Sequence, residues 1–428
     1  MLATALVLLL VLLAASIPVA AVLGVLGLAL NQFFSAMPLH RAMGEVIWGS
    51  STEYILIAIP LFVMLGEILL RSGIASRVYA AIAQWLSWLP GGLMHANIGT
   101  CALFAATSGS SVATAATVGT VAIPEIERHK YDERLFLGTL AAGGTLGILI
   151  PPSINLILYG LLTNTSVPRL YLAGIVPGVL LAVMFSVLVL VVCLIWPKRG
   201  GTPIPTSWVS RIRSLRDLLP PLLIFLVVVG SIYVGVATPT EAASLGVVAA
   251  FVLAAWERAL NWKMLRATIE GTMRTTAMIM LIILAAQFLN FVLAAIGLTD
   301  GIAAALAGMG LGPVGTMLVI VLFYLLLGCF METISMMILT TPFIAPIVFG
   351  LGYDPVWWGI VLTILIEAAL VTPPVGLNLY VVQGLRTRGQ ISDVVIGALP
   401  FVFLMFCLIL LLMWQPGVAL WMPKAVMG

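Results

Sequence analysis

Two Pro-Pro pairs inside long apolar segments are the residues best suited to chemistry in this sequence. They lie in GILIPPSIN (147–155) and TPPVGLN (372–378). A Pro-Pro pair removes two backbone donors and leaves upstream carbonyls without helical partners, so a helix must break there. Within a membrane, broken backbone survives only where it is buried in protein or lines a cavity. The freed carbonyls can coordinate Na⁺, and the N-termini of the half-helices favour an anion.

A run of small and hydroxyl residues, TSGSS (107–111), offers further oxygen ligands and exposed N–H groups. Hard oxygen ligands without a cluster of carboxylates suit a monovalent cation better than Ca²⁺ or Zn²⁺. The alternative interpretation is that such residues, like GGTLG (143–147), only let transmembrane helices pack closely. Close packing would be the better explanation of an isolated motif, but these motifs are not isolated.

The composition identifies a membrane protein. Of 428 residues, 62% are hydrophobic and only 8% are charged, whereas a soluble domain has about 25% charged residues. Soluble enzymes, DNA-binding modules and disordered linkers are therefore excluded. The four cysteines show no CxxC spacing, which indicates neither a disulfide framework nor a metal site. No cofactor is expected beyond a coupling ion.

The apolar segments predict an all-α polytopic fold. They cover 2–30, 51–70, 133–164, 168–196, 217–236, 240–257, 276–297, 356–384 and 393–416, and Pro18 is expected to kink the first unless that helix tilts. Two other stretches, 92–127 and 313–350, are interrupted by polar residues and fit re-entrant hairpins. Segments 75–89 and 259–275 are expected to lie along the membrane face.

The basic residues favour the hairpins over full spans, because Lys and Arg prefer cytoplasmic loops. With both stretches as hairpins and the N-terminus inside, 16 of the 19 basic residues are cytoplasmic, and Arg41, Arg169 and Lys424 are outside. Two full spans would instead move the basic linker 197–216 and the 258–274 cluster outside. The hairpin topology is therefore predicted.

An internal repeat relates the two halves of the chain. An offset of 222 positions, or 223 for the last pair, matches Pro124, Tyr131, Asp132, Pro151-Pro152 and Asn155 with Pro346, Tyr353, Asp354, Pro373-Pro374 and Asn378. Five predicted spans separate the hairpins, so the hairpins enter from opposite sides. An inverted-topology repeat of this kind is typical of secondary transporters with a site near the midplane.

The same motifs resemble a known family. SGSSVATAATVGTVAIPE (108–125), GGTLGILIPPSIN (143–155) and TPPVGLNLY (372–380) closely resemble the large membrane subunit of TRAP transporters, the tripartite ATP-independent periplasmic class. The match covers essentially the whole chain. It implies an elevator-type, Na⁺-coupled importer of an organic acid, such as a C4-dicarboxylate or sialic acid, across the bacterial inner membrane. It also implies two partners: a small four-helix membrane subunit and a periplasmic substrate-binding protein.

Carried over by motif, the resemblance implies two Na⁺ sites, each pairing a hairpin tip with a broken helix. The first would comprise Ser108, Ser110, Gly147, Ile150 and Pro151, and the second Gly328, Thr333, Thr372, Pro373 and Gly376. The second tip has Glu332 where the first has Ser110, so the sites need not be identical.

Four residues are expected to face the substrate: Ser111, Asn155, Glu332 and Asn378. The two asparagines could donate to a substrate carboxylate or cap the second half-helices. Glu332 and Glu367 are intramembrane acids, which either take part in ion coupling or are structural carboxyl groups.

The domain boundaries expected in an elevator arrangement follow the repeat. A scaffold surrounds a moving transport domain made of the two hairpins and the two broken helices. The ranges are 1–91 (scaffold helices and an interfacial arm), 92–165 (first hairpin and broken helix), 166–312 (central scaffold with linker 197–216 and arm 259–275), 313–385 (second hairpin and broken helix) and 386–428 (C-terminal scaffold helix).

Other function classes fit the sequence less well. A stand-alone carboxylate transporter or a channel is the alternative within transport, although a channel would more plausibly show a symmetric filter or charged ring. An intramembrane serine protease would need a base near Ser108 or Ser110, for which His95 at the hairpin base is the available histidine. The sequence contains no GxxxxGK[ST] motif, which an ATP-driven pump would need to bind ATP. A transporter rather than an enzyme is predicted.

Overall fold

The computed structural model describes residues 1–428 except 109, 203–205, 299–300, 303, 305–307 and 309, and it leaves the side chains of 2 and 105–108 undescribed. Secondary structure in the described part is helical apart from one isolated bridge between Tyr131 and Gly200. The elements are α1 (Leu2–Ala14), α2 (Val19–Phe34), η1 (Leu39–Ala42), α3 (Met43–Ser51), η2 (Tyr54–Ile57), α4 (Ala58–Arg71), α5 (Ile74–Leu86), α6 (Leu93–Ser108), α7 (Ser111–Arg128), α8 (Glu133–Leu149), α9 (Ile154–Thr163), α10 (Val167–Ile195), η3 (Pro197–Arg199), α11 (Trp208–Tyr233), α12 (Pro239–Trp256), α13 (Trp262–Ala295), α15 (Gly312–Leu327), α16 (Thr333–Gly350), α17 (Pro355–Val371), α18 (Leu377–Gly384), α19 (Ile391–Trp414) and α20 (Gly417–Met427).

The length and composition of these helices confirm a polytopic membrane protein. Among the described residues, 7 helices are long and apolar enough to cross a membrane, or up to 8 if the bent pair α8 and α9 counts as one span. Helix α10 illustrates the pattern: Val179, Val183 and Val187 are exposed at a spacing of four, while Phe185 and Val189 are buried. An apolar stripe that faces outward at helical spacing is suited to lipid rather than water.

The helix boundaries confirm the internal repeat. Helices α7 and α16 begin at Ser111 and Thr333, and α8 and α17 begin at Glu133 and Pro355, so both pairs are displaced by 222 positions. The matched aspartates have the same structural role. Asp132 is the N-cap of α8 and Asp354 is the N-cap of α17, and the side chains accept hydrogen bonds from backbone N–H groups of their helices. The two halves therefore share their local structure as well as their sequence pattern.

The predicted breaks are confirmed. Helix α8 ends at Leu149 and α9 begins at Ile154 after a bend of 45°. Helix α17 ends at Val371 and α18 begins at Leu377. Each hairpin stretch is likewise two helices around a short break, α6 with α7 and α15 with α16. The N-terminal segment also divides, with Pro18 in the N-cap position of α2.

Three predictions about helix extent were wrong. The arm at 259–275 and the span at 276–297 form one helix, α13, because Asn261 caps its start and neither proline nor a loop sequence interrupts it. At 34 residues it is about 51 Å long and exceeds the ~30 Å hydrocarbon slab. Helix α11 begins at Trp208, ahead of the predicted start at 217. The C-terminal segment contains two helices, α19 and α20, separated at Gln415-Pro416.

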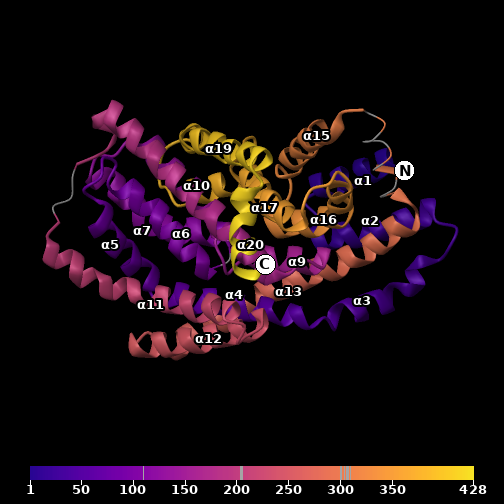
Figure 1. The fold of residues 1–428 in the computed structure, drawn as a ribbon, viewed down its shortest axis with the longest axis horizontal. Helices are drawn as coiled ribbons and strands as arrows, with labels where there is room; N and C mark the ends of the chain where they lie inside the picture. Colours follow the sequence, from indigo (N-terminus) through magenta and orange to yellow (C-terminus); the bar gives the residue numbers. More distant parts are fainter. Residues whose placement is uncertain (109, 203–205, 299–300, 303, 305–307, 309) are drawn as a thin grey trace.

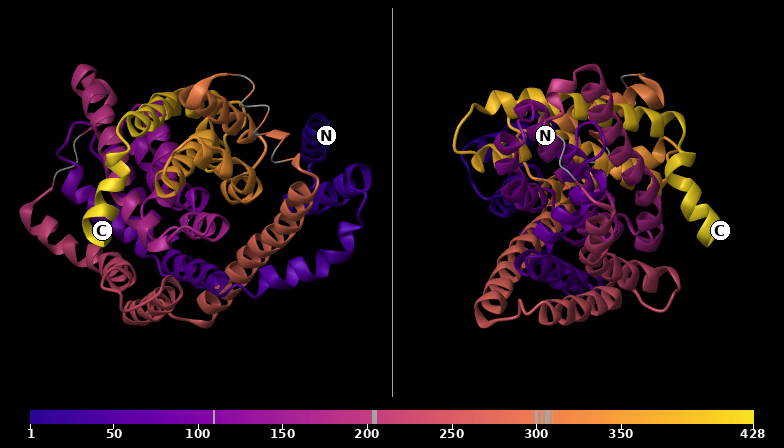
Figure 2. Two further views of the ribbon diagram at one scale, coloured as in Figure 1. Left: turned by 45° about the vertical axis from the view of Figure 1, so that its right-hand side comes forward. Right: turned by 90° about the vertical axis from the view of Figure 1, so that its left-hand side faces the viewer.

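The helices form an outer frame and an inner group. In Figure 1, α11, α12, α13 and α3 follow the lower edge of the molecule, and Figure 2 shows the same long helices framing the rest in the turned view. Within the frame, α4 packs against α12 and α13, and α13 packs against α2. The inner group is built on α8 and α17, in which every residue from Leu135 to Leu149 and from Val356 to Val371 is buried. Helices that are apolar all round occupy a core.

Helices α8 and α19 meet through glycines. A Cβ atom at Gly138 would collide with the carbonyl of Gly397, and one at Gly397 would collide with the carbonyl of Arg134. Small residues at such a contact let two membrane helices approach to backbone distance.

We expect Gly138→Ala to destabilise the protein by about 1–3 kcal/mol, because the added methyl group must push the two backbones apart. Thermal unfolding of the purified protein in detergent measures the change. The matched control is Gly230→Ala in α11, where the new methyl group would meet open space. Equal unfolding temperatures for the two variants would contradict the close contact.

Candidate functional site

The two hairpin tips are capped by repeat-related residues. Ser110 is the N-cap of α7, and its Oγ accepts a hydrogen bond from the Ala113 N–H at 3.3 Å. Glu332 is the N-cap of α16: its Oε1 accepts from both the N–H and the hydroxyl of Ser335 at 2.8 Å, and its Oε2 accepts from the Ile334 N–H at 3.3 Å. A carboxylate at a helix N-terminus is stabilised by the helix dipole. The difference between the tips is therefore a change of capping group at one shared position.

The first tip lies between the two buried helices. The Ser111 hydroxyl donates to Oε1 of Glu367 in α17 at 2.9 Å. On its other side, the Ser111 carbonyl is so close to α8 that a Cβ atom at Gly144 would be 2.9 Å from it. Ser111 thus connects the first hairpin to a helix of each repeat.

The second tip also packs against α17. Gly328, the C-cap of α15, leaves no room for a side chain because a Cβ atom there would collide with Ala369. Thr333, at the start of α16, is buried. Both tips therefore contact α17 within three positions of each other, at Glu367 and Ala369, just before the second Pro-Pro break.

Glu367 is a buried carboxyl group with one hydrogen bond. It is 1% exposed, its Oε2 has no hydrogen-bond partner, and no ion pair involves it in the described part of the chain. An unpaired carboxylate in apolar surroundings is costly. This group therefore needs a proton or a nearby cation.

The two repeat-related asparagines are fully buried. Neither amide atom of Asn155 has a partner among the described residues. Asn378 donates through Nδ2 to the Ala141 carbonyl at 3.4 Å, while its Oδ1 has no such partner. The prediction that they cap the second half-helices was wrong, since the caps are Ser153 for α9 and Gly376 for α18. Unused buried amides next to a break suit a polar ligand or water.

The breaks free the carbonyls that the sequence suggested. In an α-helix the carbonyl of Gly147 would accept from residue 151 and that of Ile148 from residue 152, but both positions are proline and carry no N–H. At the second break, Thr372 is the C-cap of α17, and its hydroxyl donates to the Ala368 carbonyl at 2.6 Å. The breaks differ in exposure: Pro151 and Pro152 are buried, whereas Pro373 is half-buried and Pro374 is exposed.

The structure brings several predicted residues together and leaves others untested. Ser110 and Glu332 occupy the tips, Ser111 contacts α8 and α17, and Asn155 and Asn378 follow the breaks. The side chain of Ser108 lies outside the described residues. The cation ligands remain predictions. No cluster of three or more His, Cys, Asp or Glu side chains that could hold a metal occurs among the described residues.

His95 is too far from the tip serines to act as their base. It lies near the start of α6, where Nε2 is 2.9 Å from the Pro90 carbonyl, and Ser108 ends that helix. Thirteen residues of α-helix separate the two by about 20 Å. A catalytic Ser-His pair requires hydrogen-bond distance.

The sequence did not predict which residues contact the two hairpin tips. Gly144 and Ala369 are small residues in contact with the tips, and Ala141 supplies a carbonyl to Asn378. The paired glycines at 143–144 were a signal of close approach, but nothing in the sequence identified Ser111 as the partner of Glu367.

Comparisons with known proteins agree with this arrangement. Residues 6–418 match the family model described as "Tripartite ATP-independent periplasmic transporter, DctM component". The chain is 34% identical to the C4-dicarboxylate TRAP transporter large permease protein DctM of Pseudomonas aeruginosa over 90% of each chain. It is 30% identical to the isethionate TRAP transporter permease protein DctMQ of Oleidesulfovibrio alaskensis, covering 94% of this chain and 63% of that protein.

One solved structure shows the same fold. The crystal structure of the Alcanivorax borkumensis YdaH transporter aligns with a TM-score of 0.65 over 98% of this chain and 99% of its own. Its sequence identity is 15%, so the likeness concerns the fold alone.

We expect Ser111→Ala to destabilise the protein by about 1–3 kcal/mol, because it leaves the Glu367 carboxyl without its donor. The effect should shrink in a Glu367→Gln background, where the amide group is less costly to bury unpaired. Thermal unfolding of the four proteins gives the coupling energy. Ser231→Ala is the control, since the Ser231 hydroxyl donates within its own helix to the Val228 carbonyl. Strictly additive effects would argue against the contact.

Proposed function

Because this chain belongs to the tripartite ATP-independent periplasmic transporter family, as its DctM component, we propose that it is the Na⁺-coupled subunit that imports a small organic acid across the bacterial inner membrane. It is a multi-pass transporter subunit rather than an enzyme. One observation supports the mechanism most directly: the tips of both hairpins contact α17, at Glu367 and Ala369, just before the second break.

Each break can supply a cation site. The first Na⁺ ion would be held by hydroxyls of Ser108 and Ser110 and carbonyls near Gly147, Ile150 and Pro151. The Gly147 carbonyl has no helical partner, which supports this role. The second ion would be held by the tip around Gly328 and Thr333 together with Thr372, Pro373 and Gly376. The exposure of Pro374 leaves that break accessible.

The substrate would bind between the two half-helix N-termini. Asn155 and Asn378 lie in the first turns of α9 and α18, where N–H groups and the helix dipole favour an anion. The unused amide atoms of Asn155 support a ligand there. Ser111 would line the same space, while the carboxylate of Glu332 serves mainly to cap α16. The names of the two relatives specify a C4-dicarboxylate and isethionate, both small organic anions. A C4-dicarboxylate or sialic acid is the substrate we favour.

An elevator movement would carry this site across the membrane. The hairpins and broken helices (92–165 and 313–385) form the moving part, and α2, α4, α12 and α13 pack together as scaffold. Helices α10 and α19 pack against both α8 and α17, and α19 meets α8 at backbone distance. We therefore assign these two helices to the moving part instead of to the scaffold proposed from the sequence.

Two partner proteins would complete the transporter. A periplasmic substrate-binding protein would deliver the organic acid, and a small four-helix membrane subunit would join the scaffold. The description of the family as tripartite supports two further components. A stand-alone transporter or channel would need neither partner.

The central experiment is uptake into proteoliposomes that contain this chain and its small membrane subunit. We expect accumulation of the organic acid only with an inward Na⁺ gradient and with the binding protein present. Replacing Na⁺ by K⁺ tests the ion, and omitting the binding protein separates this function from a stand-alone transporter. Undiminished uptake in K⁺ would refute Na⁺ coupling.

We expect Ser110→Ala to lower Na⁺ affinity by roughly tenfold, equivalent to the loss of one interaction of about 1.4 kcal/mol. The amount of folded protein in the membrane should fall less. Thr120→Ala is the matched control, because the Thr120 hydroxyl is exposed and donates to the Ala116 carbonyl within the same helix. Parallel losses of affinity and folded protein in Ser110→Ala would instead support a packing role for the tip.

A further inference from the structure

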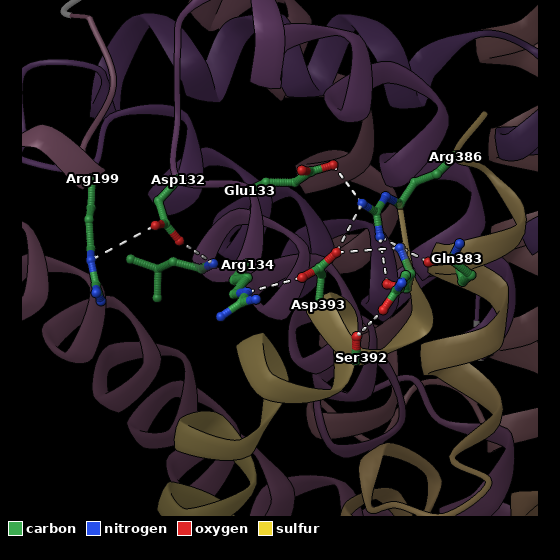
Figure 3. Close-up of polar contacts among 10 residues, drawn as sticks. Asp132, Glu133, Arg134, Arg199, Gln383, Arg386, Ser392 and Asp393 are labelled. Atoms are coloured by element: carbon green, nitrogen blue, oxygen red, sulfur yellow. Dashed lines mark hydrogen bonds and ion pairs between the residues drawn. The ribbon is translucent and has the colours of Figure 1, made fainter. Parts of the chain in front are cut away.

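A buried arginine lies at one end of the moving part. The Arg386 side chain is 3% exposed, and the residue follows Leu385, the C-cap of α18. Its Nη2 is 2.6 Å from Oε1 of Glu133 and 3.7 Å from Oδ2 of Asp393. Its Nη1 donates to Oε1 of Gln383 at 2.9 Å and to the Gln390 carbonyl at 3.2 Å. Figure 3 shows this guanidinium group between the first turn of α8 and the start of α19.

The network extends beyond Arg386. Asp393 also accepts from Nε of Arg134 at 3.0 Å, and the Gln383 amide donates to the Gly389 carbonyl at 3.0 Å. The turn is shaped around the guanidinium group: Gly389 has a φ of +92°, and a Cβ atom there would collide with Arg386. Only glycine combines that backbone angle with that space.

The segment that begins with α18 contacts α8 at two places. Asn378 donates to the Ala141 carbonyl of α8, and Arg386 pairs with Glu133 of α8. Residues 378 and 386 are eight positions apart, as are 133 and 141, which corresponds to about 12 Å of helix. The segment that begins with α18 is thus fixed to α8 near both of its ends.

Helix α18 needs such external support. It has eight residues, fewer than an isolated helix needs for stability, and its N-cap Gly376 has no capping side chain. It follows the second Pro-Pro break and carries Asn378. Its position therefore depends on the contacts at its two ends.

We infer that Arg386 is a positioning residue of the transport site: by fixing the C-terminal end of α18 to the first turn of α8, it sets the spacing between the two halves that bind the ion and the substrate. The inference rests on the proposed function. Its guanidinium group donates hydrogen bonds to acceptors from α8, α18 and the turn and forms an ion pair with Asp393 of α19. A planar group with five donors can make these contacts together, and a lysine cannot.

The first test measures Na⁺ affinity without the unidentified substrate. Na⁺ should raise the unfolding temperature of the purified chain, with K⁺ as reference, and a titration gives the apparent dissociation constant. We expect Arg386→Gln to weaken Na⁺ binding by about 2- to 30-fold, with Arg386→Lys between it and the wild type.

Arg388 provides the matched control. It is two positions further on, its side chain is 72% exposed, and it pairs with the exposed Glu127. Arg388→Gln should leave Na⁺ affinity unchanged, because an exposed pair contributes little. If Arg386→Gln does not fold, Glu133→Gln serves instead, since Glu133 is 47% exposed and its loss leaves the other contacts of Arg386 in place.

The second test does not depend on Na⁺. Spin labels at Tyr380 of α18 and Arg128 of α7, both exposed, report the position of α18. We expect a shifted or broadened distance distribution in Arg386→Gln and the wild-type distribution in Arg388→Gln. Unchanged Na⁺ affinity together with an unchanged distance distribution would overturn the inference. A wild-type protein without any Na⁺ response would refute the proposed coupling ion, and the label distances would then decide the role of Arg386.

Discussion

A backbone in hydrocarbon must satisfy its own hydrogen bonds, and the rest of this structure depends on the two places where proline prevents it. Each Pro-Pro pair removes the donors that would close the last turn of α8 or α17. Unpaired carbonyls at membrane depth are tolerated only when protein or a polar cavity surrounds them. Helices α8 and α17, which end at these breaks, are buried from Leu135 to Leu149 and from Val356 to Val371, and hairpin tips pack against them.

The burial of α8 and α17 has an electrostatic consequence. Apart from Glu367, their ionisable groups lie at or next to their N-terminal ends. Asp132 and Asp354 cap the helices there, and Glu133 and Arg134 join the ion pairs of Arg386 and Asp393. At membrane depth the described carboxyl groups are held by a hydroxyl, as in Glu367, or by a helix N-terminus, as in Glu332. Neutral oxygen and amide groups thus dominate the centre of the site.

The sequence predicted the parts of the fold that follow from local chemistry. Proline cannot continue a helix, so the breaks at 150–153 and 372–376 could be located, and the 222-residue repeat identified matching elements. The continuous α13 and the separate α20 could not be found in this way. Apolar composition indicates that a helix is present but not where it begins and ends. The contact between Ser111 and Glu367 joins residues 256 positions apart. Such a pair depends on how the first residue of α7 meets α17 while the helix packs against α8, which no local pattern predicts.

The unequal exposure of the two breaks has a consequence for the transport cycle. Pro151 and Pro152 are enclosed, while Pro374 of the matching element reaches the surface. Since α7 and α8 match α16 and α17 at both of their ends, the structure of each half can serve to describe the other. In the proposed elevator movement, exchanging the conformations of the two halves would generate a second arrangement of the same chain, with the first break open and the second closed. The asymmetry within one structure would then describe the opposite end state of that movement.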